Sequence, residues 1–205
     1  MALDLLGARH EWPDDATAAL AESVLARADA LRRAVRELAL RGRGALRTRV
    51  HGDFHLGQVL VVQDDAFIID FEGEPARTLE QRREKSSGLR DVAGLLRSFD
   101  YAAAAAAPGR AAASPSTGER RATLLERFRT EAGQRFLQAY RATLEHAPVP
   151  WVGKEAEAPL LDLFLLEKAA YEIRYEAANR PAWLAIPLRG LHAIAERVLQ
   201  SEDVT

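Results

Sequence analysis

Two short acidic segments flank a stretch of β-branched residues, and their side chains suit phosphoryl transfer. The first segment runs from His51 to Gln58 and contains Asp53, and the second runs from Asp70 to Glu74. Phosphoryl transfer needs one carboxylate that orients the acceptor hydroxyl and takes its proton, and other oxygen ligands that hold a metal ion against the phosphates. Because a hairpin brings its two ends together, we expect Asp53 and Asp70 to face one cleft.

The order of residues in these segments matches the kinase signature. That signature is His-x-Asp, an amide residue five positions after the aspartate, and Asp-Phe-Gly beyond a hairpin. It predicts Asp53 as the catalytic carboxylate, with Asp70 and Gln58 as Mg²⁺ ligands. Gln58 replaces the usual asparagine and offers the same oxygen on a longer arm. Glu72 interrupts the last element as Asp-Phe-Glu-Gly, and Glu72 and Glu74 are either metal-site acids or solvated loop carboxylates.

An alternative chemistry uses the histidines of the first segment. His51, Asp53 and His55 form His-x-Asp-x-His, and alternate residues of a strand share a face, as the ligands of a metal hydrolase do. That interpretation leaves the acidic segment after Asp70 unexplained. In the kinase interpretation His51 instead packs and forms hydrogen bonds that shape the loop.

The elements that must position these residues are mostly helical. Val59–Val62 and Phe67–Ile69 predict a β-hairpin with a turn at Asp64 and Asp65. Apolar spacing predicts helices over 14–40, from about 88 to the alanine run, around 124–140, over 159–179 and over roughly 188–200. Residues 108–118 are small and proline-containing and predict a mobile loop. We expect a mostly α (α+β) fold with a small hairpin at the active site.

The helix expected at 159–179 presents a second candidate surface. Lys168, Tyr171 and Tyr175 fall on one face at spacings of three and four residues. A sugar site combines aromatic rims with hydrogen-bonding groups, so these three residues are candidate acceptor contacts. A half-buried tyrosine stripe beside a surface lysine is the alternative explanation.

Four stretches carry a resemblance to a known family. They are HGDFHLGQVLV, IIDFEGEP, LRDVAGLLRSFDYAA and YEAANRPAWLAIPL. They closely resemble maltokinase, above all the maltokinase half of trehalose synthase–maltokinase fusions, within the aminoglycoside phosphotransferase-like kinases. The resemblance covers most of 46–107 and 160–195, and it extends to the helix at 14–40.

This resemblance implies that 1–205 is the C-terminal lobe of a kinase-like fold. The implied reaction transfers the ATP γ-phosphate to maltose with Mg²⁺, giving maltose 1-phosphate, with trehalose synthase as a possible partner. It also implies that Asp91, on a helix behind the catalytic loop, accepts backbone N–H bonds from that loop. A non-catalytic truncated lobe that binds a sugar or docks on trehalose synthase is the first alternative, and a kinase for another sugar such as glucosamine is a further one.

An ATP-binding N-terminal lobe is expected to be missing from this chain. Such a lobe supplies a glycine-rich loop and a lysine on the phosphates. The residues before His51 contain no lysine, since Lys85 is the first, and their clearest element is a helix. We therefore expect the isolated chain to be a poor kinase, and the remaining lobe to be a partner.

Composition narrows the other partners. The formal net charge of −2 gives no reason to expect nucleic acid or an anionic membrane surface. There is no cysteine, which excludes disulfides and cysteine metal sites. No run reaches the roughly 18 apolar residues of a membrane span. These features favour a cytoplasmic enzyme.

Overall fold

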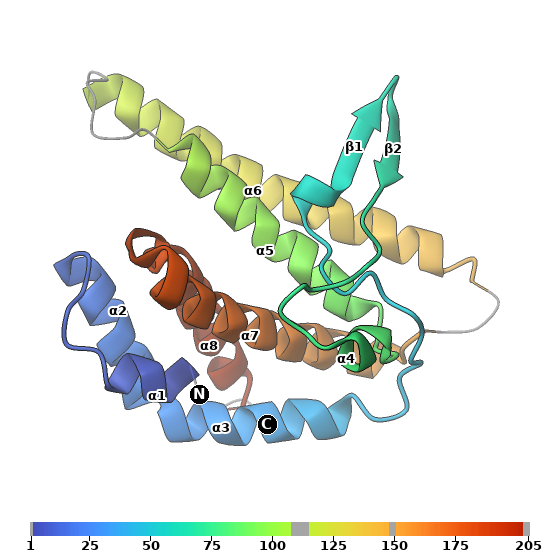
Figure 1. Cartoon of the computed structure of the whole chain (residues 1–205), viewed down its shortest axis with the longest axis horizontal. Coiled ribbons are helices and arrows are strands. Elements are labelled where there is room, and N and C mark those ends of the chain that lie inside the picture. Colours follow the sequence, from blue (N-terminus) through green and yellow to red (C-terminus); the bar gives the residue numbers. More distant parts are fainter. Residues whose placement is uncertain (1, 108–114, 148–150, 203–205) are drawn as a thin grey trace. The chain divides into compact units, whose positions relative to one another are not determined.

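The structure, a computed structural model, describes residues 2–107, 115–147 and 151–202. Helices make up most of this part of the chain, and β1 (Val59–Val62) pairs with β2 (Asp65–Ile68) in a two-stranded antiparallel sheet (Figure 1). The predicted mostly helical fold with one small hairpin is therefore confirmed. The chain divides into two compact units, Met1–Ala45 with Val152–Thr205, and Leu46–Trp151.

The regular elements of the first unit are all helices within its described residues. Its elements are α1 (Ala2–Gly7), α2 (Asp15–Ala26), α3 (Ala28–Arg41), α7 (Lys154–Asn179), the 3-10 turn η2 (Pro181–Trp183) and α8 (Ala185–Glu202). Its core gathers apolar side chains from these helices, including the fully buried Leu6, Ile173, Leu184 and Leu188. Asp14 caps α2 by accepting hydrogen bonds from the side chain and backbone of Thr17, and these bonds lower the pKa of the Asp14 carboxyl.

The helix predicted over 14–40 is two helices in the structure, and that prediction is wrong at Arg27. Arg27 leaves helical geometry with φ −107° and ψ 12°, and it separates α2 from α3. Leu31 and Leu38, which the prediction places on the apolar face, are buried in α3. Ala34 is fully buried, whereas Val35, which a continuous helix places on the apolar face, is 37% exposed. Apolar periodicity alone does not reveal a break that preserves helical spacing on both sides.

The helices near the C-terminus begin earlier than the sequence predicted. α7 starts at Lys154 rather than at 159, so Pro159 lies inside the helix, and α8 starts at Ala185. Glu155 and Glu157 in the first turn of α7 stabilise its N-terminus through the helix dipole. A proline this close to the helix start removes one early hydrogen bond and leaves the rest of the helix intact.

In its described residues the second unit contains the hairpin, the 3-10 turn η1 (Leu56–Gln58) and three α-helices, α4 (Leu79–Arg83), α5 (Leu89–Ala106) and α6 (Pro115–Leu144). α5 and α6 run alongside each other (Figure 1), and Phe99 meets Phe128 edge-to-face at 6.0 Å between ring centroids. Of the loop predicted over 108–118, residues 108–114 lie outside the described residues, and 115–118 belong to α6.

The hairpin turn lies one residue earlier than the sequence suggested. Gln63 and Asp64 both have positive φ, 50° and 66°, which is the two-residue turn whose twist suits a hairpin. Asp65 pairs with Val62 in the strands instead of forming part of the turn. Across the described parts of the molecule, none of the helices has both the length and the apolar character needed to span a membrane.

Candidate active site

His51 ties the first acidic segment to the residues that follow the hairpin. Its side chain is buried, and Nε2 lies 2.8 Å from the carbonyl oxygen of Ile69. Because a carbonyl only accepts, Nε2 must carry the proton, which leaves Nδ1 to accept from the backbone N–H of Asp53 at 3.4 Å. The ring also packs against Phe54 and Phe71, at 5.4 and 4.9 Å between centroids. His51 therefore holds both acidic segments in one local arrangement.

Asp91 holds the same loop from the first turn of α5. One carboxylate oxygen accepts the backbone N–H of His51 at 2.7 Å, and the other accepts that of Gly52 at 2.9 Å. The resemblance to a kinase fold implied bonds of this kind for Asp91. A charged acceptor shared by two consecutive amides strengthens both bonds and fixes the start of the loop.

The interior of α5 provides the surface on which the loop rests. A Cβ atom on Gly94 would lie 2.5 Å from the carbonyl oxygen of Phe54, so only glycine permits this approach. One turn further, the Ser98 hydroxyl accepts the backbone N–H of Leu56 at 3.2 Å. Asp91, Gly94 and Ser98 thus form one face of α5, which we name the α5 platform.

Gly94→Ala is expected to lower stability by about 1–3 kcal/mol, because the new methyl group forces the Phe54 backbone away from the helix. Gly133→Ala on α6 is the matched control. Its Cβ would meet only Leu96 Cδ2, at 3.4 Å, so we expect no loss, or a gain of up to about 1 kcal/mol from helix propensity. Thermal unfolding of both variants checks this, and equal midpoints would contradict the close approach.

Asp70 and Gln58 meet at the base of the hairpin. Gln58 Nε2 donates to Asp70 Oδ2 at 3.0 Å, and the backbone N–H of Ile69 donates to the backbone carbonyl of Gln58 at 3.0 Å. Asp70 has φ +62°, an uncommon conformation for a residue with a side chain, and such strain is typical of functional positions. Asp53 lies on the same loop, with Oδ2 3.9 Å from His55 Nε2. The same His55 nitrogen lies 3.5 Å from Gln58 Nε2, so His55 connects Asp53 to the Gln58–Asp70 pair in one local cluster of loop residues.

Asp70 and Gln58 suit Mg²⁺ better than a metal ion that takes all its ligands from the protein. No group of three or more His, Cys, Asp or Glu side chains within the described residues is arranged to hold a metal ion. Mg²⁺ commonly takes one or two protein ligands and completes its shell with water and phosphate oxygens. One Asp70 carboxylate and one Gln58 amide oxygen, after rotation of that amide, meet this requirement. The Glu74 carboxylate makes a local contact instead, because its Oε1 accepts from the backbone N–H of Ala76. Glu72 is contacted through its backbone carbonyl, which accepts from Arg82 Nη1.

His51 is not available as a metal ligand for the hydrolase site that His-x-Asp-x-His suggested. Both ring nitrogens of His51 are engaged within the loop, one as donor and one as acceptor. A metal-binding histidine needs a free ring nitrogen with an exposed lone pair. The structure therefore favours the packing role for His51.

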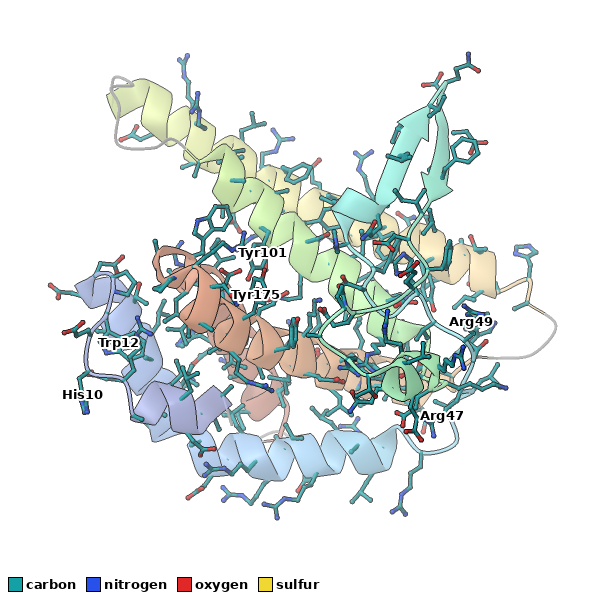
Figure 2. All side chains as sticks on the ribbon, in the orientation of Figure 1. His10, Trp12, Arg47, Arg49, Tyr101 and Tyr175 are labelled. Carbon is teal, nitrogen blue, oxygen red and sulfur yellow. The ribbon has the colours of Figure 1, made fainter. Side chains whose placement is uncertain are left out.

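On α7 the three candidate sugar contacts, Lys168, Tyr171 and Tyr175, lie in a row along the helix, and we call this row the α7 series. Lys168 Nζ lies 5.2 Å from the Tyr171 ring centroid, and Tyr171 stacks on Tyr175 with 6.4 Å between centroids and 24° between planes. Tyr175 is 45% exposed and labelled in Figure 2. The Arg180 guanidinium lies over the other end of the series, 5.6 Å from the Tyr175 centroid, and makes two hydrogen bonds to the buried carboxylate of Glu176.

Sequence reasoning missed several of these supporting residues. Gly94 carried a usable signal, since an isolated glycine inside an apolar helix stripe often marks a close approach. Ser98 carried none, because serine is common on helix surfaces. The pairing of Glu176 with Arg180 was visible as a spacing of four residues, but its burial was not.

Comparison with known proteins finds relatives that are named glucosamine kinase. No family model matches the chain. A glucosamine kinase of Streptacidiphilus jiangxiensis is 28% identical over 143 residues, which are 67% of this chain and 29% of that protein. A glucosamine kinase of Mycolicibacterium smegmatis is 30% identical over 149 residues, 71% of this chain and 34% of that protein. The chain thus spans about a third of the length of these relatives.

Solved structures give the same name. A glucosamine kinase in crystal form B superposes with a TM-score of 0.71 at 25% identity, over 94% of this chain and 43% of that one. A glucosamine kinase in complex with glucosamine, ADP and inorganic phosphate gives a TM-score of 0.64 at 20% identity, over 98% and 46%. The interpretation as a maltokinase is therefore wrong, and neither maltose nor a trehalose synthase partner finds support. The chain has the fold of part of a glucosamine kinase.

Proposed function

We propose that this chain is the catalytic and acceptor-binding lobe of an ATP-dependent sugar kinase that acts on glucosamine. The single observation that carries the phosphotransfer assignment is the loop cluster of Asp53, Gln58 and Asp70, anchored by Asp91 and His51. The two relatives and the solved structures named glucosamine kinase support the choice of sugar. In this proposal the chain corresponds to the C-terminal lobe of a kinase-like fold.

In this proposal each loop residue has one task. Asp53 accepts a hydrogen bond from the acceptor hydroxyl, orients its oxygen toward the γ-phosphate of ATP and takes the proton as the new bond forms. Asp91 and His51 hold the backbone that carries Asp53, so its carboxylate is positioned before substrate arrives. Asp70 and Gln58 would hold Mg²⁺, which supplies charge neutralisation at the phosphate oxygens. Glu72 adds negative charge beside this pair.

The specificity of the proposed kinase can be tested with a hybrid protein. The chain would be joined to the remaining segment of a glucosamine kinase relative, because the chain spans only a third of those proteins. Release of ADP would be followed with ATP, Mg²⁺ and glucosamine, glucose or maltose in turn. The proposal requires the largest kcat/KM with glucosamine and loss of turnover when Mg²⁺ is chelated. A preference for maltose, or turnover without a divalent cation, would refute it.

The α7 series is proposed as an acceptor contact, and Tyr175→Ala tests it. Loss of an exposed aromatic face that packs on a sugar is expected to weaken glucosamine binding about 2–10-fold. Calorimetric titration of the chain with glucosamine measures the change directly. Phe128→Ala, which removes a similarly exposed ring from α6, is the control and should leave the dissociation constant unchanged. If Tyr175→Ala lowers only the unfolding temperature, Tyr175 has a packing role and the acceptor assignment fails.

A further inference from the structure

A second cavity lies in the unit that carries the loop cluster. Its volume is about 350 Å³, within the range of small-molecule sites, and its lining is overwhelmingly apolar. Asp53, Gln58 and Asp70 do not line it, although His51 and Asp91 do. The cavity is therefore separate from the proposed phosphotransfer residues but shares the two residues that position their loop.

The walls of this cavity are aromatic. Phe54 and Phe71 come from the two acidic segments, Tyr140 from α6, and Trp151 from the end of the unit. Gly88 lies close to two of these rings, because an added Cβ would lie 3.0 Å from the Trp151 ring and 3.2 Å from the Tyr140 hydroxyl. Flat rings on several sides favour a planar ligand, because aromatic groups prefer stacked or edge-to-face contact.

Two lining residues carry a charge, the Asp91 carboxylate and the Arg49 guanidinium. Both carboxylate oxygens of Asp91 accept backbone N–H bonds, and both ring nitrogens of His51 are engaged. Arg49 also lines the cavity and is exposed, and its guanidinium makes no hydrogen bond or ion pair with any residue that the structure describes. Arg47, on the same extended segment (Figure 2), is instead bonded to the Lys85 carbonyl.

From this arrangement we propose that the cavity binds a planar aromatic molecule that carries an anionic group, such as a carboxylate. The rings of Phe54, Phe71, Tyr140 and Trp151 contact the aromatic body, and Arg49 pairs with the anion at the rim. A guanidinium group can form two parallel hydrogen bonds with a carboxylate, so Arg49 favours an anionic ligand over a neutral one. Because His51 and Asp91 line the same cavity, the ligand would contact the residues that hold the Asp53 loop.

The test uses 2-naphthoate as the probe and 2-naphthamide, its uncharged counterpart, as the comparison. Calorimetric titration of the 205-residue chain should show saturable one-to-one binding of 2-naphthoate. Arg49→Gln should weaken 2-naphthoate about fivefold, the size of an exposed ion pair, and leave 2-naphthamide unchanged. Arg83→Gln removes the same charge from α4, outside the cavity, and should have no effect.

A second variant addresses the cavity itself. Thr48→Phe adds a ring at the lining while the Thr48 backbone remains paired with Ser86, so it should weaken both probes at least tenfold. Absence of saturable binding, or binding that neither Arg49→Gln nor Thr48→Phe alters, would overturn the proposal and place any uptake at another apolar surface. If Thr48→Phe does not fold, the Arg49→Gln comparison between the charged and uncharged probes decides alone.

Discussion

Asp53→Asn is expected to lower the turnover of glucosamine phosphorylation by roughly 10²–10⁴-fold, the usual contribution of a positioned proton acceptor. The amide keeps the size of the side chain but cannot accept the hydroxyl proton. Because this role operates mainly in the transition state, kcat and kcat/KM should fall together while glucosamine affinity changes little. The hybrid kinase described above, assayed at saturating ATP, gives both constants.

Asp64→Asn is the matched control for this experiment. It makes the same chemical change at the hairpin turn, where Asp64 has φ 66° and asparagine is well tolerated. Its turnover should equal that of the unaltered protein. Near-normal turnover of Asp53→Asn would remove Asp53 from the catalytic role, whatever the control shows.

Asp91→Ala is expected to have the largest structural effect, a loss of about 3–5 kcal/mol of stability. Each of the two backbone amides, of His51 and Gly52, loses a charged acceptor, and hydrogen bonds to charged groups contribute roughly 1.5–3 kcal/mol apiece. Chemical denaturation monitored by circular dichroism measures the free energy of unfolding. The same variant should lose turnover at temperatures where the chain remains folded, because the loop that carries Asp53 is released.

A first-turn acid also stabilises a helix through its dipole, and this smaller effect needs its own control. Glu155 lies in the first turn of α7, is exposed, and makes no side-chain hydrogen bond or ion pair with the residues that the structure describes. Glu155→Ala should therefore cost only about 0.3–1 kcal/mol. If Asp91→Ala and Glu155→Ala cost the same, Asp91 acts on the helix alone and does not anchor the loop.

The parts of this molecule that were predictable from sequence are those governed by local rules. The hairpin followed from β-branched runs, and the loop cluster followed from a motif whose residues are close in sequence. Even there the turn moved from Asp64–Asp65 to Gln63–Asp64, because the pairing of Val62 with Asp65 is set by the register of the whole hairpin. Local signals identify an element more reliably than its limits.

Features that depend on packing could not be predicted from the sequence. The break at Arg27 and the exposure of Val35 follow from how two helices meet their core, since each half keeps a helical apolar pattern of its own. The α5 platform depends on the Phe54 carbonyl approaching Gly94, a contact between residues far apart in sequence. The identity of the sugar was also not predictable from the sequence: the motifs indicated a phosphotransfer site, and the resemblance to maltokinase led to the wrong acceptor.

Transfer of a labelled phosphoryl group tests the central claim most directly. ATP with ¹⁸O at the non-bridging γ-phosphate oxygens would be supplied with Mg²⁺ and glucosamine to the hybrid kinase, with and without Asp53→Asn, and the products separated by mass. Direct phosphoryl transfer predicts a glucosamine phosphate that retains all the labelled oxygens. The amount of this product should be strongly reduced in Asp53→Asn. Labelled inorganic phosphate without any sugar phosphate, or equal amounts of sugar phosphate from both proteins, would contradict it.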